Sequence, residues 1–555
     1  MFRTFRSILI LLTGALAAFG GHPKVDRDLE KENPESMVDV IIQYKRPPTA
    51  GHRQKVHDKG GKHKRDLSAI KGSHYAVPAK ALAELANDPD VAAISPDRPL
   101  RSMNDITVAT VGADLAANYG YDGTGIGVAV IDSGIAYDHE DLKGRIVYSQ
   151  NFVAEKMDDL YGHGSHVAGI LGGSGRKSHG NAFSRNLRGM APNVNFIDLR
   201  VLDQNGSGTD SSVIAAISQA IALKAKYNIR VINLSLGRAP AGSYANDPLC
   251  MAVEAAWKAG IVVVAAAGNG GRDNSMGTSG YGTITAPGND PYVITVGAME
   301  SMTTTSRWDD RIASYSAKGP TGFDHIVKPD LVAPGNRIVS VLGKEANLDA
   351  SYPRTRVENN YYKSRGDSNN SPDYFQLSGT SMATPVVSGA AALMIQRDPS
   401  LTPDQVKARL MKTASKTFPY SSTATDPVTG ATYTSQYDIF TIGAGYVDVF
   451  AAINNYEKAA GSAKSPAVVF DSLGKTVSLV LGQGVVWGSG VVWGSGVVWG
   501  SNAFVSGTGV VWGSGVVWGS GGSLQGTGVV WGSGVVWGTG MPTGEATAIA
   551  INGEN

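Results

Sequence analysis

Short apolar runs that alternate with helical patterns constrain the fold of residues 107–457 more than any other feature of this sequence. Polar residues hardly interrupt these runs, which is typical of strands buried on both faces. Parallel strands need long crossover connections, so the alternation predicts an α/β fold, a doubly wound parallel sheet covered by helices. The expected strands are residues 126–131, 194–199, 231–234 and 261–267, and the clearest expected helices are residues 211–226 and 249–259.

Residues 35–101 show a mixed pattern of their own. Strand-like residues 38–42 and 91–94 flank a short amphipathic helix at residues 79–86, which indicates a small α+β unit. The Lys/Arg-rich residues 53–65 are interpreted as a solvated loop, and residues 343–373 as a long polar surface loop of the α/β region. Histidines near the first loop leave a second interpretation open, a segment that loosens when its imidazoles become charged.

The first twenty residues have the pattern of a secretory signal peptide. Arg3 and Arg6 precede an apolar run at residues 8–18, and Ala15-Leu-Ala17 offers small residues for cleavage. The alternative is a membrane anchor, but the run is shorter than the roughly 20 residues that a span needs. Cys250 is the single cysteine, so no intramolecular disulfide is possible, and export without disulfides favours a bacterial origin. Within its helical apolar pattern, Cys250 is expected to be a buried small side chain.

The charge balance argues against one class of partner. The chain has 49 Lys+Arg against 48 Asp+Glu, a formal net charge of +1. Dedicated nucleic-acid binders usually carry a basic excess, so no nucleic acid is expected as a partner.

Two motifs of the central region carry titratable groups. Asp132 ends the apolar strand Gly-Val-Ala-Val-Ile-Asp, at the strand end where a doubly wound sheet collects functional groups, although a helix cap is the commoner role for a lone Asp. His163 lies in Gly-His-Gly-Ser-His-Val-Ala-Gly, and neutral imidazole is the usual general base near pH 7. His163 and His166 could instead bind a metal, but no third ligand nearby completes a zinc-type set.

Two further motifs supply a hydroxyl and an amide. Ser381 lies in Leu-Ser-Gly-Thr-Ser-Met-Ala-Thr-Pro, just before a helix of small residues in which Pro385 is expected to occupy the first turn. The positive end of that helix dipole would favour a reactive serine, and the alternative is an N-cap serine. Asn269 ends the run Ala-Ala-Ala-Gly-Asn, where its side chain could donate to a developing oxyanion or could serve a turn.

Together the four motifs resemble those of the subtilisin-like serine proteases (subtilases, peptidase family S8), with Asp132, His163 and Ser381 in the subtilisin order. The resemblance spans residues 107–457 and includes one neutral departure, Ser165 where many relatives have Thr. It implies that Ser381 attacks the scissile carbonyl, that His163 accepts and returns the proton, and that Asp132 orients the imidazole. It also implies that Asn269 and the backbone N–H of Ser381 stabilise the oxyanion.

The same resemblance implies a substrate pocket and an inhibitor. Residues 21–101 look like the inhibitor propeptides of the family, which have a ferredoxin-like β-α-β-β-α-β form, with processing expected between Asp97 and Asp105. The alternative is an ordinary N-terminal interaction domain. The implied pocket segments bring no carboxylate, so cleavage after bulky apolar residues is expected rather than after basic ones. These segments are Ser235, Leu236, Gly237, Ala266, Ala267 and Gly268.

No cofactor is expected for the chemistry, and structural calcium is doubtful. Many subtilases bind calcium, and Asp141 matches one ligand position of the family's tight site. The loop at residues 173–189 departs from the family pattern, because it carries four cationic side chains that would repel a divalent ion. They are Arg176, Lys177, Arg185 and Arg188.

Residues 476–544 contain no charged residue and no histidine, and they hold seven copies of Gly-Val-Val-Trp-Gly-(Ser/Thr). An even period of six would keep each residue type on one face of an extended chain. Three interpretations remain: a β-rich ribbon whose indoles bind a glycan or other cell-surface polymer, a self-associating tail, or a flexible low-complexity tail.

We therefore expect four segments: a signal peptide (1–20), an inhibitor domain (21–101), a catalytic domain (102–460) and a repeat-containing tail (461–555). The expected function is that of a secreted serine endopeptidase made as an autoprocessed zymogen, with polypeptide substrates. The alternative function is a surface-binding or adhesion protein in which the Trp-rich tail is the main functional part.

Overall fold

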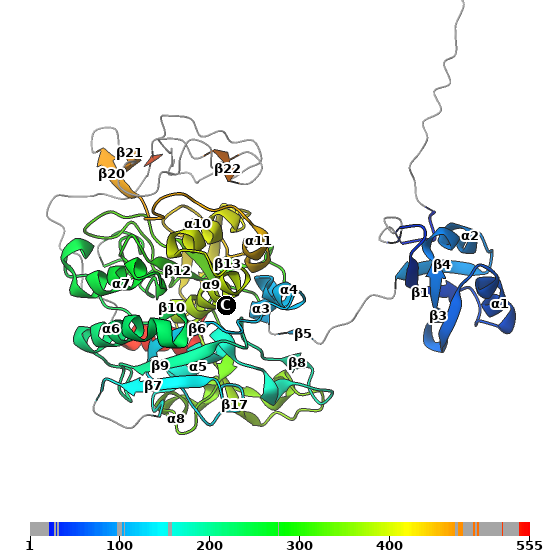
Figure 1. Ribbon diagram of the computed structural model, residues 1–555, viewed down its shortest axis with the longest axis horizontal. Helices are drawn as coiled ribbons and strands as arrows, with labels where there is room; N and C mark the ends of the chain where they lie inside the picture. Colours follow the sequence, from blue (N-terminus) through cyan, green and yellow to red (C-terminus); the bar gives the residue numbers. More distant parts are fainter. Residues whose placement is uncertain are drawn as a thin grey trace, which may run out of the picture. The chain divides into compact units, whose positions relative to one another are not determined.

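The computed structural model comprises two compact units, residues 1–101 and 102–555 (Figure 1). The structure describes residues 22–26, 29, 33–96, 103–104, 106–153, 158–275, 277–471, 476–480, 492–493, 497–498, 524–525 and 543–554. The expected signal peptide and nearly all of the tryptophan repeats lie outside these residues. Within them, no helix combines the length and the apolarity needed to cross a bilayer.

The first unit is a four-stranded antiparallel sheet with two helices. Its strands are β1 (Met37–Tyr44), β2 (Lys62–Leu67), β3 (Gly72–Pro78) and β4 (Val91–Pro96), in the spatial order β2-β3-β1-β4. Helices α1 (Ala50–Asp58) and α2 (Leu82–Ala86) complete the order β-α-β-β-α-β, which is the ferredoxin-like arrangement. One apolar cluster, which includes Val40, Ile42, Tyr75 and Leu82, forms its core.

The prediction of a solvated loop at residues 53–65 is wrong, because these residues form most of α1 and β2. The error has a physical reason: five of the six residues of β2 are exposed and Leu67 is only partly buried, so the strand carries no apolar alternation. His52 is buried at the start of α1 and contacts Asp90 through Nε2 at 3.2 Å. His52 is therefore part of the packed structure of this unit and not of a solvated loop.

A mostly parallel sheet forms the centre of the second unit. The strands are β6 (Gly127–Asp132), β7 (Ile146–Asn151), β9 (Asn195–Arg200), β10 (Ile229–Leu234), β11 (Val262–Ala266), β12 (Ile294–Glu300), β13 (Arg311–Ile312) and β14 (Leu331–Pro334). Their order is β13-β12-β11-β10-β6-β9-β7, with β14 beside β12, and only β13 runs antiparallel to its neighbour. The four strands expected from the sequence are all present, and β6 and β11 are buried throughout.

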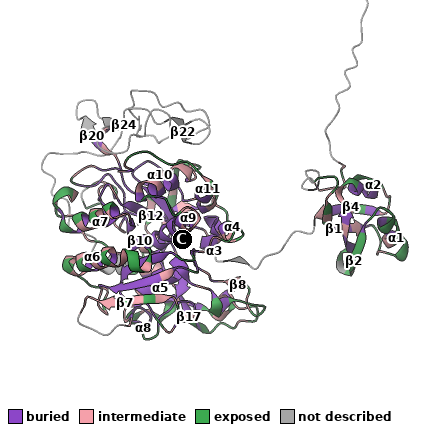
Figure 2. Cartoon of the chain, viewed as in Figure 1, coloured by how far each residue is buried: buried purple, intermediate pink, exposed green. Residues whose placement is uncertain are grey.

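Helices cover this sheet (Figure 1). α5 (His163–Gly172) and α9 (Thr380–Arg397) pack against each other, and α9 lies along β10, β11 and β12; α6 (Asp210–Tyr227) and α7 (Pro248–Lys258) form a second packed pair over β10 and β11. Burial is nearly continuous in α5 and α9, whereas α6 and α7 also carry exposed residues (Figure 2). The close approach of α9 requires small residues, since a Cβ at Gly389 would lie 2.4 Å from Cβ of Met190. Cys250 on α7 is fully buried, as expected.

Residues 343–373 are not the structureless loop that the sequence suggested. They include α8 (Asn347–Ser351), β16 (Arg356–Glu358) and the start of β17 (Asn370–Leu377), and β17 lies between β16 and β15 (Ile338–Val341). Tyr362 and Tyr374 pack edge to face in a small separate cluster with Val357. Buried tyrosines thus supply a local core to a segment that is polar in overall composition.

The remaining elements of the second unit lie outside the central sheet. They are α3 (Ile106–Thr110), α4 (Ala113–Ala117), α10 (Pro403–Thr413), α11 (Val449–Asn454), the pair β5 (Met103–Asn104) and β8 (Arg185–Asn186), the hairpin β18 (Ser421–Thr425) and β19 (Thr432–Gln436), the hairpin β20 (Ala467–Asp471) and β21 (Thr476–Val480), the short strands β22 (Val492–Trp493), β23 (Val497–Val498) and β24 (Leu524–Gln525), and α12 (Thr543–Asn552).

Two parts of residues 461–555 pack into the second unit. Val468 and Leu479 of the β20–β21 hairpin join a cluster with Val327 and Phe440. Ile549 of α12 belongs to the main core. In the sequence, the repeats therefore lie between two packed elements, the β20–β21 hairpin and α12, rather than after the last packed element.

Candidate functional site

Parallel pairing brings the four sequence motifs to one edge of the central sheet. Asp132 is the last residue of β6, and β6 lies beside β10, which lies beside β11. Ser235 follows β10 directly, and Asn269 follows β11 after two residues. His163 begins α5, and Ser381 is the second residue of α9. All the expected site residues thus lie where strands end and helices begin.

His163 is hydrogen-bonded to Asp132, with 2.7 Å between Nδ1 and the carboxylate oxygen Oδ1. Asp132 is fully buried, and the backbone N–H of Ser133 donates to the same oxygen at 2.8 Å. Burial by itself disfavours a charged imidazole, but the charge and hydrogen bond of Asp132 outweigh it, so the pKa of His163 lies above its usual value. This arrangement leaves Nε2 as the ring nitrogen that can accept a proton.

Asp159 holds the turn in front of His163, and the sequence motifs did not reveal it. Its carboxylate accepts from the backbone N–H groups of Gly162 at 2.8 Å and Ser165 at 2.7 Å, and from the hydroxyl of Ser133 at 2.8 Å. It is buried, and burial raises its pKa. The only sequence signal was the acidic pair Asp158-Asp159 just before the histidine motif. Such a pair is equally typical of a solvated turn.

His166 does not join His163 in a metal site. Its Nε2 lies 3.0 Å from the backbone oxygen of Ile338, and burial lowers its pKa to about 3, so it stays neutral within the core. No group of three metal-ligating side chains occurs among the described residues. The second histidine of the motif is therefore a packing residue beneath the turn.

Ser381 and Ser235 bind each other reciprocally. The Ser381 hydroxyl donates to the backbone oxygen of Ser235 at 3.0 Å, and the Ser235 hydroxyl donates to the backbone oxygen of Ser381 at 2.8 Å. Pro385 explains the second bond. The sequence placed this proline in the first turn, but α9 begins at Thr380, so Pro385 is its sixth residue and lies inside the helix. Lacking an N–H, it leaves the carbonyl of Ser381 without a helical donor, and Ser235 supplies one.

Asn269 is oriented by Thr380. The side-chain oxygen of Asn269 accepts from the backbone N–H of Thr380 at 2.9 Å and from its hydroxyl at 3.0 Å. The amide nitrogen lies near the neighbouring residue Gly379, where an added Cβ would be 3.2 Å from it. Both polar atoms of the Asn269 side chain therefore lie close to the turn that carries Ser381.

The segments expected to line the substrate pocket flank this turn. Gly237 and Gly268 both approach Thr285 so closely that a Cβ on either would lie 2.7 Å from its side chain. Ala267 is fully buried, and its backbone N–H donates to Val296 at 3.0 Å. Leu236 is partly buried and packs against the main core, and Ala266 ends β11. The six residues are therefore neighbours along the ends of β10 and β11.

The donor set at Asp141 does not fit a calcium ion. Asp141 is fully buried, and both carboxylate oxygens are already occupied: the Tyr374 hydroxyl donates to one at 2.6 Å, and the backbone N–H of Lys177 donates to the other at 2.9 Å. Calcium needs six to eight oxygen ligands. Here one carboxylate is satisfied by a hydroxyl and a backbone N–H of the protein.

Comparison with known proteins gives consistent matches. The family model described as the subtilase family matches residues 123–445. Serine protease AprX of Bacillus subtilis (strain 168) is 41% identical over 300 residues, which cover 52% of this chain and 61% of that protein. The extracellular serine proteinase of Thermus sp. (strain Rt41A) is 35% identical over 356 residues, 62% of this chain and 71% of that protein. The crystal structure of a cold adapted subtilisin-like serine proteinase shares 30% identity with a TM-score of 0.39, covering 57% of this chain and 89% of the other.

Replacing Asp159 tests its role in the His163 turn. In D159A two buried N–H groups lose their acceptor, which costs about 1–3 kcal/mol each in free energy of unfolding. The melting temperature should fall well below that of D158A, which changes the neighbouring carboxylate and leaves these bonds intact. Equal melting temperatures for the two variants would contradict this role.

Proposed function

The chain belongs to the subtilase family of serine proteases, and on that premise we propose that Asp132, His163 and Ser381 are its catalytic triad in a secreted, autoprocessed endopeptidase. The 2.7 Å hydrogen bond between Asp132 and His163 carries most weight. It supplies the oriented imidazole that a serine nucleophile needs, at the sheet edge where Ser381 also lies.

In the proposed mechanism, Ser381 first leaves its resting partner. Its hydroxyl rotates from the backbone oxygen of Ser235 toward Nε2 of His163, which accepts the proton as the oxygen attacks the substrate carbonyl. Asp132 stabilises the imidazolium that forms. His163 then donates this proton to the leaving amine, and water hydrolyses the acyl-enzyme by the same proton transfers in reverse.

Two donors are proposed to stabilise the tetrahedral oxyanion. One is the Asn269 amide, which Thr380 orients. The other is the backbone N–H of Ser381, because N–H groups in the first turn of a helix have no acceptor within that helix. Loss of a side-chain donor of this kind costs roughly 10²–10³ in kcat.

The N-terminal unit is proposed to be an inhibitory propeptide. Its β-α-β-β-α-β order supports this, as does the connection at residues 97–105, where cleavage would separate the two units. The signal-like residues 1–20 support export, and one relative is named an extracellular proteinase. No cofactor is proposed for the chemistry.

The Trp-rich repeats are proposed to be a separate interaction segment for a cell-surface polymer or for a second copy of the chain. Their seven tryptophan motifs without charged residues support this, since each indole offers a large apolar ring and a polar N–H. Substituting all seven tryptophans by serine separates this role from proteolysis: surface binding should be lost, while casein hydrolysis is retained. If hydrolysis falls with the binding, the two functions are not separate.

Ser381 can be identified directly by labelling. A serine-directed phosphonate should modify this residue alone, and peptide mapping by mass spectrometry locates the adduct. S381A should neither hydrolyse casein nor cleave its own chain between Asp97 and Asp105, because both reactions need the nucleophile. Full casein hydrolysis by S381A would overturn the proposed triad.

The raised pKa of His163 makes a pH prediction. The general base must be neutral, so kcat/KM rises with pH as His163 loses its proton, and the raised pKa places this acid limb above the ordinary histidine value. D132N removes the charge that stabilises the imidazolium, so the limb should move to lower pH, while kcat falls by about 10⁴. An acid limb that stays in place would show that another group controls it.

Specificity is proposed to favour bulky apolar residues before the scissile bond. The six segment residues bring no acid, and the nearby Arg238 is already paired with Asp210 and Asp247. Profiling with a peptide library measures the preference. A dominant preference for Arg or Lys would refute it.

A further inference from the structure

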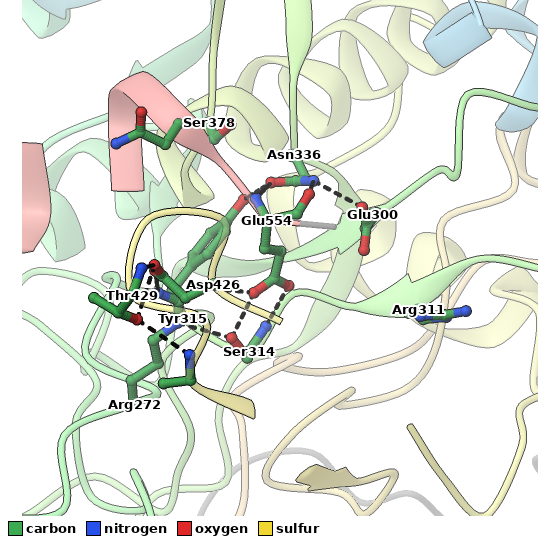
Figure 3. Close-up of polar contacts among 12 residues, drawn as sticks. Arg272, Glu300, Arg311, Ser314, Tyr315, Asn336, Ser378, Asp426, Thr429 and Glu554 are labelled. Atoms are coloured by element: carbon green, nitrogen blue, oxygen red, sulfur yellow. Dashed lines mark hydrogen bonds and ion pairs between the residues drawn. The ribbon is translucent and has the colours of Figure 1, made fainter. Parts of the chain in front are cut away.

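The end of the described chain is buried behind the two turns that carry Ser381 and Asn269. Ile549 and Ile551 of α12 are buried in the main core, and Glu554 is fully inaccessible to solvent. A carboxylate in such a place is stable only when its partners replace water. Figure 3 shows the Glu554 carboxylate directed toward Arg272 and Ser314.

The partners of the Glu554 side chain lie on the Asn269 side. Its carboxylate pairs with the Arg272 guanidinium at 2.8 Å and accepts from the backbone N–H of Ser314 at 2.6 Å and from its hydroxyl at 2.5 Å. Arg272 is the third residue after Asn269, and its side chain is only 2% exposed. Next along the chain, the Tyr315 carbonyl accepts from the backbone N–H of Gly271 at 2.8 Å. Glu554 thus contacts the turn that follows Asn269 in two ways: directly through Arg272, and indirectly through Ser314, whose neighbour Tyr315 binds Gly271.

The backbone of the same segment lies against the Ser381 turn. The N–H of Ser378, three residues before Ser381, donates to the backbone oxygen of Ala550 at 2.9 Å. Gly553 fits directly against this serine, because an added Cβ would lie 2.6 Å from Ser378 Oγ. The backbone N–H of Glu554 donates to the side-chain oxygen of Asn336 at 3.1 Å, and the Asn336 amide donates back at 3.0 Å.

Gly335 and Tyr315 connect the contacts on the Asn269 side with those on the Ser381 side. The backbone N–H of Gly379 donates to the carbonyl of Gly335 at 2.8 Å, and the Tyr315 hydroxyl donates to that same carbonyl at 3.1 Å. Tyr315 follows the residue that Glu554 binds, and Gly335 precedes Asn336. One segment therefore contacts the supports of both turns at once.

The other charged groups around Glu554 fit this arrangement. Asp426 also binds Arg272, at 2.5 Å, so the guanidinium has two carboxylate partners. Glu300 accepts from the Asn336 amide at 3.2 Å; burial and then the negative charge of Glu554 raise its pKa to about 7. The Asn336 side chain thus binds the carboxylate of Glu300 and the backbone of Glu554.

We propose that residues 550–554 are an internal clamp, with Glu554 as a positioning residue that keeps the Ser381 and Asn269 turns in their catalytic relation. The proposal rests on the function proposed for Ser381 and Asn269. It also means that removing everything after the β20–β21 hairpin would remove the clamp together with the repeats, and would lower proteolysis for a reason unrelated to tryptophan.

Two substitutions in the full chain test the clamp. E554Q keeps the size of the side chain and an acceptor for Ser314, but it removes the charge that Arg272 binds. G553A keeps Glu554 and presses a methyl group against Ser378 Oγ, at a φ of +62°. Each should lower kcat per active site by about tenfold, with KM changed less than about twofold, because small displacements of reacting groups slow the chemical step.

Matched controls exist for both variants. D448N removes the charge from another Arg–carboxylate pair, with Arg307 at 2.9 Å, at the start of α11. G461A introduces a methyl group at a similar φ of +83°, with no atom within 4 Å of it. Neither residue contacts the catalytic turns, so both controls should keep the wild-type kcat per active site.

Active-site titration with a phosphonate separates positioning from folding. A merely structural role lowers the titratable fraction and leaves kcat per titrated site unchanged, and that result for E554Q and G553A would overturn the clamp. If E554Q does not fold, G553A decides, since it retains the ion pair. A wild-type chain that the phosphonate does not label would instead refute the triad, which keeps the two failures distinct.

Discussion

Parallel pairing of β6, β10 and β11 is the constraint on which the rest of the site depends. Parallel strands deliver all their carboxyl ends to one edge, so residues far apart in sequence must meet there. Asp132 and Asn269 are separated by 137 positions, yet Asp132 ends β6 and Asn269 follows β11 in the same row of strands. Backbone hydrogen bonds create this convergence, and the side chains only refine it.

The refinement comes from buried polar groups that are satisfied by neighbours. Asp159 binds the backbone of the His163 turn, and Thr380 orients Asn269. Glu554 binds residues that support the Asn269 and Ser381 turns. Each of these groups replaces water with a protein donor or acceptor, so each fixes a direction as well as a position. Rigid support of this kind lets the reacting groups stay aligned without reorganising during the reaction.

Much of the fold followed from the sequence, and the errors share one cause. The central strands and helices were placed within a few residues, because apolar periodicity reports burial. Residues 53–65 and 343–373 were misassigned as loops, since exposed strands such as β2 and locally packed tyrosines such as Tyr362 lack that periodicity. Pro385 was placed one turn too early, because the start of α9 depends on the geometry of the Ser381 turn.

The residue types proposed for the site, and the family of the chain, can be read from the amino-acid sequence alone. The residue types are local sequence patterns, and the order of the motifs along the chain needs no structure to be recognised. The contacts of Asp159 and Glu554 with these turns, and the donors that occupy Asp141, are visible only in the folded chain. The reason is physical: a carboxylate in a sequence gives no sign of its burial, and its role depends on which donors the fold brings to it from distant parts of the chain.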